Sequence, residues 1–175
     1  MHYIKMKRVI IALAVLGAVA AVAGLASADN FPSEEQRASA EKTAQLMHNE
    51  LFSALITEFN ETTPQNVEEG KQAISLIFNN SNRDIRLIGI VPQLQGGFNN
   101  LPSDPFERRA MTRALQGLGT TSVDRIGDRW YYRRADALSN TFHPNCVLCH
   151  QSFANLSNPG QWVGALTMRV PIDKD

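Results

Sequence analysis

The sequence predicts an α+β fold, in which helices pack against an antiparallel sheet. The predicted elements follow one another as two helices, a strand, a helix and then several strands, without an internal repeat. Residues 122–126 and 129–134 flank a Gly127-Asp128 pair, which is typical of a β-hairpin turn. The chain has 175 residues, of which 43% are hydrophobic and 19% charged, and this composition suits one globular domain.

The first 28 residues have the layout of a secretory signal peptide. Met1–Arg8 is basic, Val9–Leu25 is apolar, and Ala26-Ser27-Ala28 is an A-x-A cleavage site. Cleavage would leave residues 29–175 as the single domain. The alternative is an uncleaved membrane anchor, for which 17 apolar residues are at the short end of the usual range. The sequence favours cleavage, and thus a periplasmic domain; an uncleaved segment would tether it to the outer face of the inner membrane.

The charge of the predicted mature domain argues against nucleic-acid binding. Three of the 17 Lys and Arg residues lie in the signal segment, which leaves 14 against 17 Asp and Glu, a net charge of −3. A mildly acidic domain is not suited to bind a phosphate backbone, because such binding depends on Lys and Arg.

The mature chain is expected to begin with a long helix. Ser33 and Gln36 form a capping-box pattern at its start, and the helix should end near Asn60. Its apolar stripe is expected either to pack on the core or to form a homodimer. The stripe consists of Ala40, Ala44, Met47, His48, Leu51, Phe52, Leu55, Ile56 and Phe59.

Further elements follow from cap, turn and strand signals. Thr63 and Pro64 predict the start of a second helix, whose buried side consists of Ala73, Ile74, Leu76, Ile77 and Phe78. Asp104, followed by Pro105 and by Glu107, predicts a third helix that runs to about Leu115 or Leu118. The remaining predicted strands are Ile85–Val91 and Trp162–Pro171.

The sharpest motif is Cys146-Val147-Leu148-Cys149-His150, which contains both cysteines of the chain. C-x-x-C-H is the signature of c-type haem attachment: each thiol bonds to the haem and the histidine ligates the iron from the proximal side. A redox dithiol, a lone disulfide and half a zinc site are the alternatives. A second Cys/His cluster and a βαβ pattern are missing from the sequence, which weighs against zinc and thioredoxin-type sites. The sequence therefore predicts one covalently attached haem c.

Three further residues are candidates for the haem environment. His48 lies on the apolar stripe of the first helix, where it is either a packing residue or a distal iron neighbour. Arg109 on the third helix either faces solvent or binds a haem propionate, because guanidinium pairs well with carboxylates. Tyr132 lies on one face of the predicted hairpin, which packs on the core or the haem. His143 is expected to be an exposed loop residue, since Pro144 keeps the backbone extended.

Around the motif, the chain resembles a family of exported c-type haem proteins with a PAS-like fold, long catalogued as a domain of unknown function. Its known member type is a cyanobacterial c-haem protein proposed as a redox or gas sensor. The resemblance covers about Glu41 to Pro171. Beyond the haem motif it is carried by Asn99-Asn100-Leu101-Pro102-Ser103-Asp104-Pro105-Phe106-Glu107, Arg129-Trp130-Tyr131-Tyr132 and Trp162-Val163-Gly164-Ala165-Leu166.

The chain departs from this family at the sixth iron ligand. Members can use a cysteine on the second helix, whereas Ile77 stands at the corresponding place here and the chain has no spare cysteine. The resemblance then implies a distal side that is empty or filled by water, His48 or a methionine.

Two functions remain open from the sequence. One is a periplasmic mono-haem cytochrome that exchanges electrons with a redox partner protein. The other is a haem-based sensor or binding module for redox state or for NO, CO or O₂, since a vacant iron site admits such gases. The chain lacks kinase, receptor and DNA-binding segments, which favours the electron carrier; an enzyme would need an acid/base group over an open iron.

Overall fold

The computed structural model describes residues 31–78, 84–89, 100–150 and 160–173, apart from the side chain of Cys149. The predicted signal peptide lies outside these residues. The chain divides into two units, Met1–Ser33 and Glu34–Asp175, and the fold described here is that of the second. Among the described residues, we find no helix with the length and apolar character needed to span a membrane.

The second unit is an α+β fold, as the sequence predicts. Its helices are α2 (Glu34–Glu61), α3 (Val67–Phe78), α4 (Pro105–Ala114) and the short α5 (Cys146–Cys149). Its strands are β1 (Ile85–Gly89), β2 (Thr120–Ile126), β3 (Arg129–Ser139) and β4 (Trp162–Ile172). Within the described residues they form one four-stranded antiparallel sheet in the order β1-β4-β3-β2.

The predicted hairpin and the predicted last strand are both confirmed. Gly127 has a φ of 66° in the turn between β2 and β3, a conformation that glycine adopts without steric cost. β4 lies between β1 and β3, and residues 163–168 are all buried. The simple alternation of inward and outward side chains is lost there because helices cover both faces of this strand.

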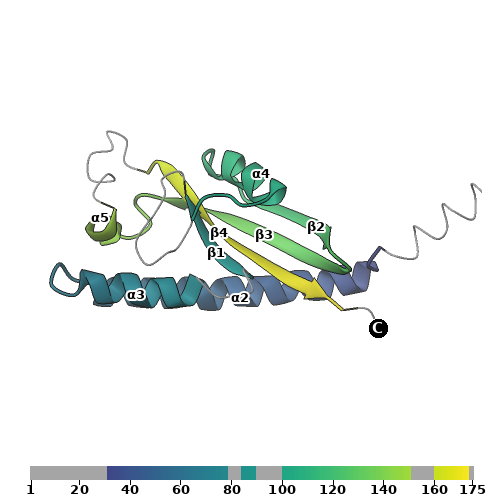
Figure 1. Ribbon diagram of the computed structural model, residues 1–175, viewed down its shortest axis with the longest axis horizontal. Helices are drawn as coiled ribbons and strands as arrows, with labels where there is room; N and C mark the ends of the chain where they lie inside the picture. Colours follow the sequence, from purple (N-terminus) through teal and green to yellow (C-terminus); the bar gives the residue numbers. More distant parts are fainter. Residues whose placement is uncertain (1–30, 79–83, 90–99, 151–159, 174–175) are drawn as a thin grey trace, which may run out of the picture. The chain divides into compact units, whose positions relative to one another are not determined.

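Helices pack on opposite faces of the sheet (Figure 1). α2 and α3 cover one face and α4 covers the other. The core under α2 and α3 contains Ala40, Ala44, Leu55, Phe78, Tyr132, Leu166, Met168, Val170 and Ile172. The core under α4 contains Ile88, Phe106, Ala110, Met111, Ala114, Ala135 and Ala165. Full burial of a side chain such as Phe106 contributes about 1.5–3 kcal/mol.

The long first helix is confirmed, and its apolar stripe mostly faces the sheet. Ala40, Ala44 and Leu55 are buried, while Met47, Leu51 and Phe59 pack against that core at its edge. Ile56 is the exception, since it is 36% exposed at the margin of the stripe.

α3 differs from the prediction at two points. It begins at Val67 rather than at Pro64, because Thr63 to Asn66 form a turn in which the Asn66 side chain accepts a hydrogen bond from the Thr63 N–H. Leu76 is 82% exposed and not buried. It points away because its neighbours Ile74 and Ile77 define the packed face, and a residue two positions from Ile74 lies on the opposite side of a helix.

Two arginines of the sheet, Arg86 and Arg133, hold α4 on the face of the sheet that lies opposite α2. Asp104 caps α4 by accepting a hydrogen bond from the Glu107 N–H at 2.9 Å, as predicted. The Glu107 carboxylate forms a buried ion pair with Arg86. Arg133 pairs with Asp104 at 2.7 Å and lies over the Phe106 ring, 4.2 Å from its centroid.

Candidate functional site

The C-x-x-C-H motif forms a single helical turn. Cys146 and Cys149 are the first and last residues of α5, and the His150 N–H donates to the Cys146 carbonyl at 2.9 Å. His150 itself has non-helical backbone angles, φ −117° and ψ 72°. The backbone thus turns once between the two cysteines and leaves the helix at the histidine. Cys146 is 6% exposed, and the side chain of Cys149 lies outside the described part of the chain.

The residues that precede the motif fix this turn to the C-terminal end of α2. The Asn145 side-chain amide donates to two carbonyls there, that of Phe59 at 2.7 Å and that of Thr62 at 2.9 Å. Carbonyls in the last turn of a helix have no partner within the helix, so a side-chain amide can cap them. Asn145 therefore caps α2 and anchors α5 at the same time.

His143 is a second anchor and is not the exposed loop residue that the sequence suggests. Its ring is half-buried and stacks on Phe59, with the centroids 5.5 Å apart. Nδ1 accepts a hydrogen bond from the Asn145 N–H at 3.1 Å, and Nε2 lies 3.1 Å from Oδ1 of Asn60. Because Nδ1 is an acceptor, the proton belongs on Nε2, which then donates to Asn60. Both ring nitrogens of neutral His143 are thereby satisfied.

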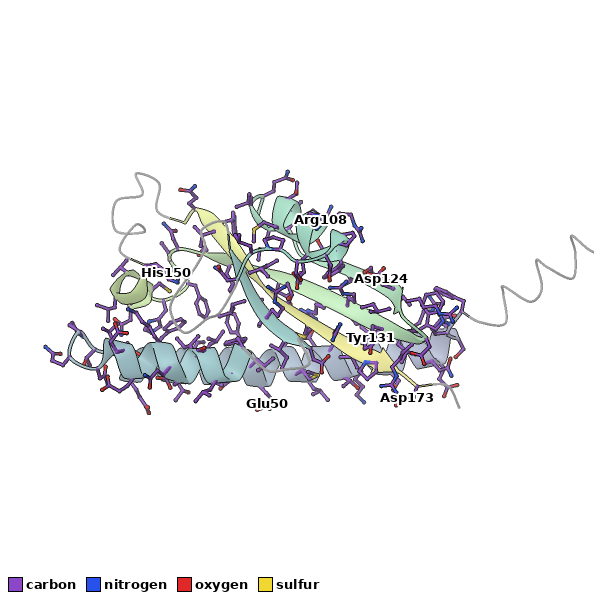
Figure 2. The ribbon with its side chains drawn as sticks, viewed as in Figure 1. Glu50, Arg108, Asp124, Tyr131, His150 and Asp173 are labelled. Atoms are coloured by element: carbon purple, nitrogen blue, oxygen red, sulfur yellow. The ribbon has the colours of Figure 1, made fainter. Side chains whose placement is uncertain are left out.

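His150 lies beside α3, the helix that packs against α5 (Figure 2). Burial lowers the pKa of His150 below its usual value of 6.5, and the positive charge of Lys71 on α3 lowers it further. His150 is therefore a neutral imidazole near pH 7. Only the neutral ring has a nitrogen lone pair that can bind a metal.

The structure places His48 away from this turn. Its Nε2 lies 3.5 Å from an Asp136 carboxylate oxygen on β3, and its ring stacks on Phe52 at 5.4 Å. His48 and Phe59 are eleven positions apart on α2, which corresponds to about 16 Å along the helix. The Phe142 ring contacts two other rings of this helix, that of Phe52 at 4.6 Å and that of Phe59 at 6.0 Å between centroids. These contacts give His48 a role in packing α2 on β3.

Tyr132 and Arg109 also lie away from the motif. Tyr132 is buried between the sheet and the first part of α2, where burial raises its pKa and the neighbouring Glu41 carboxylate raises it further. Arg109 is exposed on α4, on the face of the sheet opposite α2 and α3; its neighbour Arg108 is labelled in Figure 2. Neither side chain is brought to His150.

Sequence reasoning missed the residues that surround the turn. Lys71 is half-buried, paired with Glu68 at 2.7 Å, and is the cation whose charge reaches His150. A lysine on a helix carries no sequence signal that it will face a particular loop. The adjacency of His143, Pro144 and Asn145 to the motif was the one available hint, since Asn and Pro often shape the start of a helical turn.

Comparisons with protein-family models, curated proteins and solved structures found no match for this chain.

The described side chains of the turn, Cys146 and His150, fit a covalently held haem. Among the described residues, no group of three or more His, Cys, Asp and Glu side chains is arranged to hold a metal ion. A haem supplies four nitrogen ligands of its own, so that the protein needs to provide only an axial ligand and, in c-type proteins, thiols for attachment. Cys146 and the neutral His150, separated by one helical turn, match this requirement.

Proposed function

We propose that this chain is an exported mono-haem c-type protein that carries electrons. Cys146 and Cys149 attach the haem, and His150 ligates its iron from the proximal side. The observation that carries the proposal is the C-x-x-C-H turn itself, which is helical, is anchored on α2, and ends in a neutral histidine. When bound, the haem supplies one-electron redox chemistry.

The residues of the chain would each contribute to this function in a defined way. The thioether bonds fix the haem to α5, and the anchored turn fixes His150 relative to α3. Burial of His150 keeps its ring neutral and ready to bind the iron. Lys71 adds a positive charge nearby, which stabilises the reduced iron relative to the oxidised iron because the oxidised form carries one more positive charge.

A second function is favoured by the position of α3. This helix contacts α5 and contains Ile77, which cannot ligate iron. The resembling family uses this second helix for its sixth ligand, so an apolar residue there would leave the distal side open. A vacant iron binds NO, CO or O₂, and the protein would then be a redox or gas sensor with a PAS-like sheet. An antiparallel sheet with α2 on one face is consistent with that fold.

The attachment step is tested by exporting the chain in a host that matures c-type proteins. The Cys146→Ala/Cys149→Ala variant should lose the haem that stays with the polypeptide in a denaturing gel. Val147→Ala changes the same turn but keeps both thiols, and should retain the stain. Covalent haem in the double variant would refute the attachment, and N-terminal sequencing of the exported protein tests cleavage after Ala28.

The iron coordination is then read from absorption spectra of the reduced and oxidised protein, with and without CO. A six-coordinate reduced spectrum that CO leaves unchanged supports the electron carrier. A five-coordinate spectrum that shifts when CO is added refutes a closed iron and supports the gas-binding module.

A further inference from the structure

The connection between β3 and β4 carries the attachment turn, and it is held to α2 by two side chains that the proposed haem chemistry does not use. Asn145 makes two hydrogen bonds to the end of α2, of 2.7 and 2.9 Å. His143 supports Asn145 through its Nδ1 and stacks on Phe59 of α2. Each hydrogen bond from these two side chains to α2 and the residue after it joins residues more than eighty positions apart in the sequence.

The anchored segment runs directly into α5, where Cys146 is the first residue. The Cys146 N–H donates to the His143 carbonyl at 3.1 Å, so that the first residue of α5 is held directly by one of the anchors. With the anchors in place, Cys146 is 6% exposed. A thiol this buried is poorly accessible to a bulky reactant such as a haem.

We propose that His143 and Asn145 form a latch that holds the attachment turn closed on α2 and thereby controls access to the Cys146 thiol. The turn is released when the latch opens, and the thiol reacts in the open state. The role in haem loading rests on the proposed function, whereas the control of thiol access does not.

The chemistry explains why an open state is needed. In haem attachment the thiol adds across a vinyl group: a carbon–sulfur bond and a carbon–hydrogen bond form, while the S–H bond and the vinyl π bond break. The thiol hydrogen ends on the neighbouring carbon, and the addition itself needs no oxidant or reductant. The sulfur must therefore come within bonding distance of a large planar molecule, and Cys146, at 6% exposure, offers little surface for that approach while the turn stays on α2.

The latch is tested by the rate at which iodoacetamide alkylates Cys146 in the haem-free full-length chain, with Cys149→Ser as background so that one thiol remains. Asn145→Ala removes two hydrogen bonds. If each contributes about a factor of five to closure, alkylation should accelerate about twenty-five-fold. The rate reports local opening because a buried thiol reacts only when its segment opens.

Asn66→Ala is the matched control. Its side-chain amide also caps α2, donating to the Glu61 carbonyl at 3.0 Å, and its other side-chain hydrogen bonds within the described residues go to Thr63 and not to the attachment turn. The latch predicts that Asn66→Ala leaves the alkylation rate of Cys146 within about twofold of the parent. Equal acceleration in both variants would show general loosening of α2 and overturn the proposal, as would no acceleration in Asn145→Ala.

Two substitutions of His143 provide an independent test if Asn145→Ala does not fold. His143→Phe keeps an aromatic ring for Phe59 but removes both ring-nitrogen hydrogen bonds, the one from the Asn145 N–H and the one to Asn60. Alkylation should therefore accelerate about twenty-five-fold. His143→Asn offers an amide oxygen that accepts the N–H two residues on, and should restore slow alkylation. Rapid alkylation in both, or slow alkylation in both, contradicts the latch. Haem staining is a separate measurement, so failure of the proposed haem function remains distinguishable.

Discussion

The buried ion pair between Arg86 and Glu107 gives the most quantitative prediction of stability. The two side chains are 9% and 4% exposed, and one Glu107 oxygen accepts from Arg86 and from the N–H and hydroxyl of Ser103. Glu107→Gln would leave the Arg86 charge buried without a counter-charge. Removal of one partner of a buried pair costs about 3–5 kcal/mol. We expect the lower end, about 3 kcal/mol, because Arg86 keeps hydrogen bonds to Ser103 and the Leu101 carbonyl.

The assay is urea unfolding followed by circular dichroism. The free energies of the single variants Arg86→Met and Glu107→Leu and of their combination form a double-mutant cycle. Arg86→Met/Glu107→Leu replaces both charges by apolar side chains of similar size and should recover most of the loss, since an apolar pair avoids the desolvation penalty. The reasoning would be refuted if Glu107→Gln cost less than about 1 kcal/mol, or if the double variant were less stable than either single one. α4 packs on the opposite face of the sheet from α2. We therefore expect the variants that fold to keep the slow alkylation of Cys146.

Two further predictions concern the helix contacts. Gly70→Ala should destabilise the chain by about 1–3 kcal/mol in urea unfolding, because a Cβ would lie 2.4 Å from the Thr62 hydroxyl oxygen. Adding Thr62→Ala to the same chain should remove most of that loss, since the clashing hydroxyl is then absent. At Asp104, burial raises the pKa, but Arg133 and the backbone N–H groups of α4 outweigh it, so the folded pKa lies below the usual 3.8. The contribution of this carboxylate to stability is fully present above the pKa that Asp104 has in the unfolded chain, and it is lost as pH falls through the lower folded pKa. Asp104→Asn, which retains the cap, should therefore reduce the loss of stability between about pH 5 and about pH 3. Equal acid sensitivity in both proteins would contradict this.

The parts of the fold that local signals determine could be predicted from the sequence. Asp104 and Pro105 start α4 as expected, because a cap acts within one turn of the chain. Gly127 closes the hairpin for the same reason. The predicted start of α3 was wrong because the Asn66 side chain stabilises a competing turn. The predicted burial of Leu76 was wrong because helical spacing alone does not say which face of a helix meets the sheet.

The candidate site depends on contacts that no local pattern encodes. The motif gives Cys146, Cys149 and His150 from spacing alone, and the described part of the turn is helical. Its surroundings come from residues distant in sequence, such as Lys71 on α3. Arg109 was a candidate because a guanidinium group suits a haem propionate. It lies on α4, on the other face of the sheet, because the chemistry of a side chain does not determine which face a helix covers.

The connection between β3 and β4 that carries the motif is held at two places, and the bonds at the two places differ in kind. At its base, the Asn140 N–H donates to the Gln161 carbonyl at 2.9 Å, and the Asn140 side chain accepts from the Gly160 N–H at 3.1 Å. These bonds extend the pairing of β3 with β4, so that they open only if the sheet does. The Asn145 bonds to α2 depend on no such ladder. A displacement of α5 that carries Asn145 with it therefore breaks these two bonds while the bonds of Asn140 stay intact.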